Sequence, residues 1–210
     1  MSSCCCCSDF FERRAIRNLT LNEFENYDIS YMTYADLVYF IRMFRTSHPE
    51  LTKWNLSRWD TSNLSSMSNL FYKLGIEEID VTGWNMSNVE TTHAMFSGCT
   101  SLTTVKGLSS WNMSNVEDIS EMFFGCVSLR NLIIAGWDLI KCSNAANMFN
   151  GCRSLYSLNL TNWNVRSITN MNSMFKDCLT LSKLNLSGWQ PNNRHSEISI
   201  FDNCGVVERV

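Results

Sequence analysis

The chain has 210 residues, of which 45% are hydrophobic and 18% are charged. This composition is typical of one folded domain or repeat array and excludes a disordered chain. The 17 basic and 20 acidic residues give a formal net charge of −3, so no basic field exists to attract a nucleic-acid backbone, and nucleic acid is not an expected partner. No apolar run reaches the roughly 18 residues of a membrane span, and the start lacks the features of a secretory signal.

The chain opens with a cysteine-rich tail, residues 1–7, that contains four consecutive cysteines: Cys4, Cys5, Cys6 and Cys7. Three interpretations stay open. The tail needs no function; its cysteines could be S-acylated and anchor the chain to a membrane; or they could bind a metal or act in redox chemistry, although consecutive residues do not easily surround a tetrahedral ion. We expect contact with a membrane only if these cysteines are acylated.

Residues 8–50 are predicted to form a helical N-terminal cap. Thr33 and Asp36 have the spacing of a capping box, which marks the start of a helix. An apolar stripe with helical spacing follows: Tyr34, Leu37, Val38, Ile41 and Phe44. The helix should end near 47–49. Because an open solenoid end exposes apolar core, we expect this helix to cover the first coil; a peptide-binding or oligomerising helix is the alternative.

Residues 51–210 contain an internal repeat of about 26 residues. Tryptophans recur at intervals of 25 to 27 residues, at Trp59, Trp84, Trp111, Trp137, Trp163 and Trp189. A phenylalanine follows each of them by 12 residues, at Phe71, Phe96, Phe123, Phe149, Phe175 and Phe201. A cysteine follows the last five of them by 15 residues, at Cys99, Cys126, Cys152, Cys178 and Cys204. Constant offsets over six copies predict a solenoid of about six coils.

The spacing of these cysteines argues against a disulfide framework. A fixed period means that the same structural position is refilled in every repeat, whereas small disulfide-bonded folds space their cysteines irregularly. We therefore interpret the five periodic cysteines as reduced core residues.

Each repeat should contribute one short strand. The pattern Leu-x-x-Leu-x-Leu-x-x-Trp fills 155–163 and 181–189, and its Leu-x-Leu step has the period of two that places alternate side chains on one face. One residue is inserted between Leu102 and Trp111, where we expect a local bulge.

After each tryptophan the period changes. Apolar residues recur at steps of three and four, as in Val165, Ile168, Met171 and Phe175, which predicts a helix of one to two turns, partly 3₁₀. The residues before the cysteines tolerate the left-handed conformation that ends such a segment: Gly98, Gly125, Gly151, Asp177 and Asn203. The sequence therefore predicts an α/β parallel solenoid over 51–210.

Three motifs carry a family resemblance: Trp-Asn-Met-Ser-Asn-Val at 84–89 and 111–116, Met-Phe-x-Gly-Cys at 95–99, 122–126 and 148–152, and Leu-Asn-Leu-Ser-Gly-Trp at 184–189. The repeat resembles that of BspA-like leucine-rich-repeat proteins, the bacterial surface protein 26-residue repeat of the mycoplasma-lipoprotein type. The resemblance implies a leucine-rich-repeat-like fold and non-enzymatic surface or interaction roles. Because exported members carry a leader and none is seen here, an intracellular or assembly-bound location is favoured, including a virion or a peripheral membrane site, over the cell surface by a non-standard route.

The sequence offers no set of residues for catalysis. His48, His93 and His195 fall at unrelated positions, and no nucleophile motif or phosphate-binding loop is present. We therefore expect no enzyme activity, no cofactor and no metal site.

The predicted function is that of a non-enzymatic repeat scaffold that binds a protein partner. The candidate partner-binding strand face consists of outward polar residues: Asn55, Asp80, Lys106, Asn159 and Asn185. The alternative is an architectural component of a virion, cell-surface or membrane-associated assembly. For that role, Val207 and Val210 in a seventh strand are the candidate edge for self-association.

Overall fold

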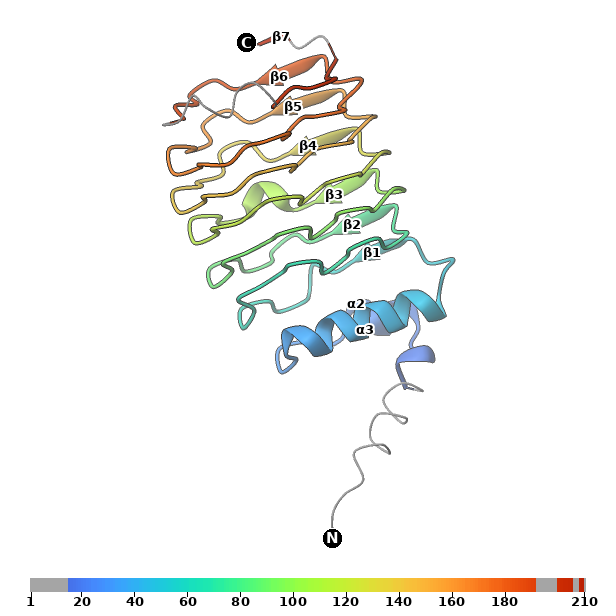
Figure 1. Ribbon diagram of the computed structural model, residues 1–210. Coiled ribbons are helices and arrows are strands. Elements are labelled where there is room, and N and C mark those ends of the chain that lie inside the picture. Colours follow the sequence, from blue (N-terminus) through green and yellow to red (C-terminus); the bar gives the residue numbers. More distant parts are fainter. Residues whose placement is uncertain (1–14, 192–199, 206–207, 210) are drawn as a thin grey trace.

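The computed structural model describes residues 15–191, 200–205 and 208–209. Stacked coils form a parallel solenoid with helices at its N-terminal end (Figure 1). Each coil contributes one short strand: β1 (Lys53–Asn55), β2 (Glu78–Asp80), β3 (Thr104–Lys106), β4 (Asn131–Ile133), β5 (Ser157–Asn159), β6 (Lys183–Asn185) and β7 (Glu208–Arg209). The predicted leucine-rich-repeat-like parallel solenoid is confirmed.

Each strand presents only one residue to the core. In β1 to β6 the middle residue is buried and its two neighbours are more exposed. The buried residues are Trp54, Ile79, Val105, Leu132, Leu158 and Leu184. This is the period of two expected of a strand with one buried face, and it leaves two outward side chains per coil on the sheet.

Two aromatic ladders run the length of the core. The ring centroids of successive ladder tryptophans lie 5.3 to 6.4 Å apart, and those of successive ladder phenylalanines 5.3 to 5.8 Å apart. Nearly parallel rings in one position bury both of their faces. The indole N–H also donates to the preceding coil: Trp84 Nε1 lies 2.8 Å from the Leu56 carbonyl oxygen, and Trp163 Nε1 lies 2.6 Å from that of Ile134.

The prediction of a short helix after each tryptophan is wrong. These segments are successive turns joined by isolated parallel bridges, such as those of Thr91 with Ser66 and Asp118. Alternate backbone N–H groups donate to the next coil; for example, Phe96 N donates to the Met122 carbonyl oxygen at 2.9 Å. Ala94, two residues earlier, has a φ of 52°, which an α-helix does not allow. Hydrogen bonds between coils have replaced those within a helix.

The residues before the periodic cysteines adopt the conformation that the sequence predicts. Gly98, Gly125, Gly151, Asp177 and Asn203 all have φ between 52° and 77°. Glycine, asparagine and aspartate reach this left-handed region at lower cost than other residues. The chain can therefore turn sharply there and enter the next strand.

The inserted residue has a larger effect than the expected bulge. The strands form two sheets, β1-β2-β3 and β4-β5-β6-β7, and the interruption follows the insertion. Gly107 has a φ of 94° and is followed by a 3₁₀ turn, η1 (Leu108–Ser110). In the described part of the chain, Trp111 Nε1 is a buried donor without a hydrogen-bond partner. The insertion thus breaks the strand ladder and one indole hydrogen bond.

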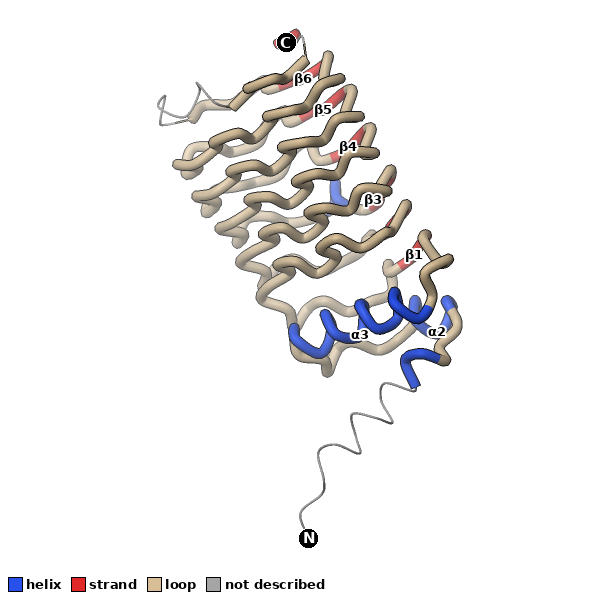
Figure 2. Tube along the Cα trace, turned by 45° about the vertical axis from the view of Figure 1, so that its right-hand side comes forward, coloured by secondary structure: helices blue, strands red, loops and turns tan. Residues whose placement is uncertain are grey.

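Two helices close the N-terminal end of the solenoid, α2 (Leu21–Glu25) and α3 (Tyr34–Ser47), and they lie across the first coil (Figure 2). The predicted capping box of Thr33 and Asp36 is confirmed. Phe24 of α2 stacks on Phe44 of α3 with ring centroids 3.8 Å apart. The cap therefore has a core of its own that continues into the solenoid.

The cap supplies the contacts that a preceding coil would make. Trp59 Nε1 donates to the Phe24 carbonyl oxygen at 3.2 Å, as later tryptophans donate to the coil before them. On the turn side, Arg45 of α3 donates to the Gly75 carbonyl oxygen at 2.8 Å. Satisfying these groups is what an end cap must do, because unpaired buried polar groups are costly.

Candidate binding face

The five candidate partner-binding residues share one position of the repeat, the last residue of a strand. Parallel pairing places Asn55 beside Asp80 and Asp80 beside Lys106, and it places Asn159 beside Asn185. They form one outward row that the sheet interruption divides. Their role in partner binding stays a prediction.

Four of these five residues have a structural role in the turn that follows the strand. The side-chain oxygen of each accepts the backbone N–H two residues further on, at 2.9 to 3.1 Å; the residues are Asn55, Asp80, Asn159 and Asn185. Asn and Asp side chains commonly bond to local backbone at turns. Lys106 has no side-chain acceptor and cannot make this bond. Turn formation alone therefore accounts for most of the polar row.

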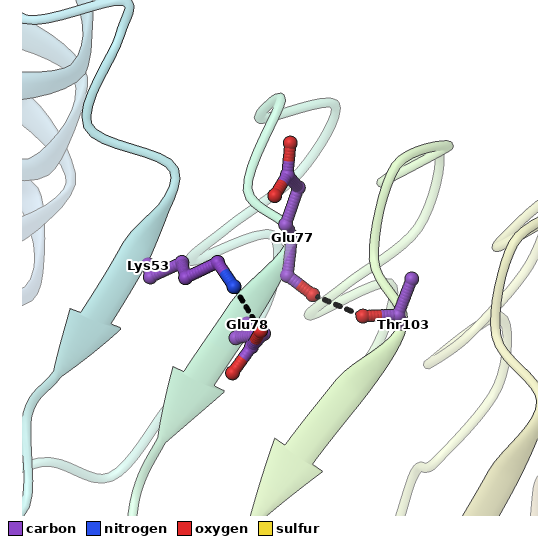
Figure 3. A network of polar contacts seen from close by, with 4 residues as sticks. All are labelled: Lys53, Glu77, Glu78 and Thr103. Carbon is purple, nitrogen blue, oxygen red and sulfur yellow. Dashed lines mark hydrogen bonds and ion pairs between the residues drawn. The ribbon is translucent and has the colours of Figure 1, made fainter.

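The N-terminal part of the face carries charges of both signs. Lys53 of β1 forms an ion pair with Glu78 of β2, and Thr103 Oγ1 donates to the Glu77 carbonyl oxygen at 3.0 Å (Figure 3). The hydrogen bond between Lys53 and Glu78 raises the pKa of Lys53 and lowers the pKa of Glu78. Such exposed pairs contribute little to stability. Three acidic side chains, Glu25, Glu78 and Asp80, face two basic ones, Lys53 and Lys106, so the excess charge of this region is small.

A shallow depression of about 190 Å³ lies over β1 to β3, with Glu25 of α2 on its rim. Glu25 accepts a hydrogen bond from the backbone N–H of Asn55 at 2.6 Å, so its carboxylate serves to join the cap to the first strand. Acidic Asp80 of β2 and basic Lys106 of β3 are paired neighbours, and both line this depression. Within the described residues, no group of three histidine, cysteine or acidic side chains could hold a metal ion.

Sequence reasoning missed the most exposed apolar residue of the sheet, Ile133 at the end of β4, which is 75% exposed. It occupies the row position between Lys106 and Asn159, where strands β1, β2, β3, β5 and β6 have Asn, Asp or Lys. Alignment of the repeats at this one position would have revealed it. An isolated exposed apolar residue is ordinary, but one that replaces a turn-capping Asn or Asp in its repeat is a departure.

A second exposed side chain lies on the next coil. Tyr156, just before β5, is 52% exposed, and the Lys183 ammonium of β6 lies 5.9 Å from its ring centroid. The backbone N–H of Tyr156 donates to the Arg130 carbonyl oxygen at 3.2 Å. Ile133 is at the carboxyl end of β4, paired with Asn159, whereas Tyr156 and Lys183 are at the amino ends of β5 and β6. Strands β4 to β6 contain no acidic residue.

Several predicted positions lie outside the described residues. These are Val207 and Val210, the candidate assembly edge, and the candidate lipidation sites Cys4, Cys5, Cys6 and Cys7. Their roles stay predictions. The seventh strand itself is present, since β7 pairs with β6 in parallel.

The two described histidines, His48 and His93, lie far apart in the chain and each has a local partner. His93 Nδ1 lies 2.8 Å from Ser120 Oγ, and His48 Nδ1 lies 3.2 Å from the Phe44 carbonyl oxygen, so each is bonded within its own surroundings; His195 lies outside the described residues. A serine beside a histidine can be a nucleophile with its base. Here Ser120 is 5% exposed, which leaves little access for a substrate.

The periodic cysteines act as hydrogen-bond donors as well as apolar core. Cys99 Sγ lies 2.9 Å from the Phe71 carbonyl oxygen, and Cys152 Sγ lies 3.1 Å from that of Phe123. The described cysteines are free thiols. Burial raises the pKa of Cys99, Cys142 and Cys152 to about 12, so the reactive thiolate hardly forms at neutral pH.

This burial predicts protection of the thiols in the native state. In a variant with serine at positions 4 to 7, we expect a disulfide reagent at pH 8 to modify the half-buried Cys204 first and the buried thiols only after denaturation. Folding raises the thiol pKa above its ordinary value of 9.0. The contribution of the neutral buried thiol to the free energy of unfolding is therefore complete below pH 9 and is lost as the pH rises towards 12. Rapid labelling of Cys152 in the native chain would contradict this account.

The stacked parallel strands and the buried ladders define the chain as a solenoid repeat protein of leucine-rich type. It belongs to the family described as "Mycoplasma protein of unknown function, DUF285", whose model matches residues 9–131, 38–157 and 102–209. The chain is similar to a solved structure, the crystal structure of the T. pallidum leucine rich repeat protein (TpLRR). The TM-score is 0.49 and the identity 18%, over 75% of this chain and 68% of that chain. No curated protein matches.

No helix in the described part of the chain, the cap helices included, has the length and apolar character needed to span a bilayer.

Proposed function

We propose that this chain is a non-enzymatic repeat scaffold that binds a protein partner through the outward face of its sheet. The observation that carries the proposal is Ile133, 75% exposed in a row that is polar in β1, β2, β3, β5 and β6. An apolar side chain in a polar surround is the arrangement of an interface anchor, which excludes water when the partner binds.

Tyr156 and Lys183 support the same face. Tyr156, just before β5, lies beside Lys183 of β6, and tyrosine is enriched among residues that carry binding energy.

The family resemblance supports this class of function. BspA-like repeats imply surface or interaction roles without catalysis, and the buried thiols fit a reduced, assembly-bound or intracellular setting. The lack of acidic residues on β4 to β6 favours a partner segment that is neutral or acidic.

The test uses a substitution that replaces the apolar residue of the row with a polar one. Ile133→Asn introduces the residue that the row has at positions 159 and 185 and should leave the fold intact. Ile140→Asn is the matched control, because Ile140 is also an exposed isoleucine, 47% exposed, but lies outside the strands.

We expect the wild type and Ile140→Asn to retain the same captured partner, and Ile133→Asn to bind it at least about tenfold more weakly. Purified chains would be compared by biolayer interferometry with that partner immobilised. Equal affinity of the two variants would refute a role for this face.

A further inference from the structure

The N-terminal cap contains a pocket that the proposed scaffold function does not use. Its volume is about 350 Å³, and it lies between the start of the described chain, the loop after α2 and the first half of α3. Pockets of this size can hold a small organic molecule. The sheet face lies elsewhere, so a ligand here would be independent of a partner bound there.

Aromatic side chains form the walls of this pocket: Tyr27, Tyr31, Tyr39 and Phe40. Tyr27 packs against Phe40 with ring centroids 4.6 Å apart, and the Tyr31 hydroxyl donates to the Tyr27 hydroxyl at 3.3 Å. Phe40 is buried, while Tyr39 is 37% exposed and Tyr31 is 67% exposed. The rings therefore extend from the buried base of the pocket to its mouth.

The only charge on the described walls of the pocket is negative. Asp36, in the first turn of α3, lines it, and its carboxylate is held by hydrogen bonds from the hydroxyl and the backbone N–H of Thr33, at 2.6 and 3.2 Å. Those bonds fix the carboxylate in position. The other described lining residues are apolar and include Ile16, Leu19 and Met32.

This combination selects a particular kind of ligand. The faces of aromatic rings attract cations, most strongly cations that shed water easily. A fixed carboxylate disfavours anions, and a neutral apolar ligand would gain nothing from it. We propose that this cap pocket binds a quaternary ammonium group, such as the one that choline carries.

The experiment compares choline with its neutral isostere 3,3-dimethylbutan-1-ol, which has the same shape without the charge. Both are titrated into the full chain, and chemical shifts or heats are recorded. We expect saturable binding of choline that is at least about tenfold tighter than that of the alcohol. Equal affinity for choline and the alcohol would show that the pocket does not recognise the charge and would overturn the proposal. The absence of saturable binding would also overturn it.

Variants assign the site. Tyr31→Ala and Tyr39→Ala should each weaken choline binding several-fold, whereas Tyr156→Ala, an exposed tyrosine on the sheet, should leave it unchanged. Circular dichroism checks that each variant is folded. Unchanged choline affinity in folded Tyr31→Ala and Tyr39→Ala chains would refute the site.

The source of the ammonium group is distinguished by vesicles. Binding of the full chain to phosphatidylcholine vesicles but not to phosphatidylglycerol vesicles, with loss in Tyr31→Ala, would support the site with a lipid headgroup as ligand. Binding of free choline alone would support it with a small metabolite as ligand.

Discussion

Replacement of Trp137 by alanine is expected to lower the free energy of unfolding by about 3 to 5 kcal/mol. The indole is 1% exposed and stacks between Trp111 and Trp163, with ring centroids 6.4 and 5.3 Å away. Its removal leaves a cavity in the middle of the solenoid, and it leaves the Leu108 carbonyl oxygen, 2.9 Å from Nε1, without that donor. Denaturant unfolding followed by far-UV circular dichroism measures the loss.

A pair of phenylalanine variants separates packing from hydrogen bonding. Trp137→Phe keeps an aromatic ring in the ladder but removes the donor to Leu108, whereas Trp111→Phe removes a buried N–H that has no described partner. The Leu108 carbonyl oxygen still accepts from the Trp111 backbone N–H at 3.2 Å, so the lost hydrogen bond should cost about 0.5 to 1.5 kcal/mol. We therefore expect Trp137→Phe to be the more destabilising of the two by about that amount. Equal losses would contradict the hydrogen-bond assignment.

The second large effect is expected at Gly107, the residue inserted in the third coil. A Cβ at this position would lie 2.3 Å from Thr82 N and 2.5 Å from Thr82 Cα, both of them backbone atoms that cannot rotate away. The φ of 94° also disfavours any residue with a side chain. Gly107→Ala should therefore destabilise the chain by about 2 to 4 kcal/mol, from overpacking and backbone strain together.

Gly136 provides the matched control for this prediction. It has a φ of 79°, and a Cβ there would meet nothing within 4 Å. Gly136→Ala should cost about 1 to 2 kcal/mol, the cost of the left-handed conformation alone. Thermal and denaturant unfolding of both variants would measure the difference. If the two substitutions cost the same, the close approach of Gly107 to the preceding coil is not a source of strain.

Most of the core could be predicted from the sequence because the same core positions recur in every copy of the repeat. Constant offsets between Trp and Phe indicated two ladders, and the structure shows both as stacked rings. The capping box of Thr33 and Asp36 could be predicted because both of its hydrogen bonds lie within four residues of the chain. Features that depend on neighbours in sequence, or on the same slot in each copy, are accessible without a structure.

The turn side could not be predicted because its hydrogen bonds connect different coils. Apolar steps of three and four normally indicate a helix, but here they come from successive turns whose N–H groups, such as that of Phe96, donate to the next coil. Local spacing contains no information about which partner a backbone group finds. The same limit concealed the donor role of the cysteine thiols, which reach carbonyl groups one coil away.

The position of the candidate face was predicted from the sequence, but the turn role of its residues was not. The outward row was correctly placed on the sheet, yet the residue types that suggested binding there, such as Asn159, cap turns. Polar identity at a strand end has two causes, and only the hydrogen bonds distinguish them. Ile133 stands out because it serves no turn, and only comparison across the repeats makes this apparent.

Hydroxyl-radical footprinting of the chain, free and bound to its captured partner, tests the central claim most directly. Oxidation of a side chain reports its exposure, and the exposed residues Ile133, Tyr156 and Phe124 sample both the sheet and the turn side. Binding through the sheet face predicts that the partner protects Ile133 and Tyr156 and leaves Phe124, in a turn segment, unchanged. Protection of Phe124 with no change at Ile133 and Tyr156 would contradict the proposal.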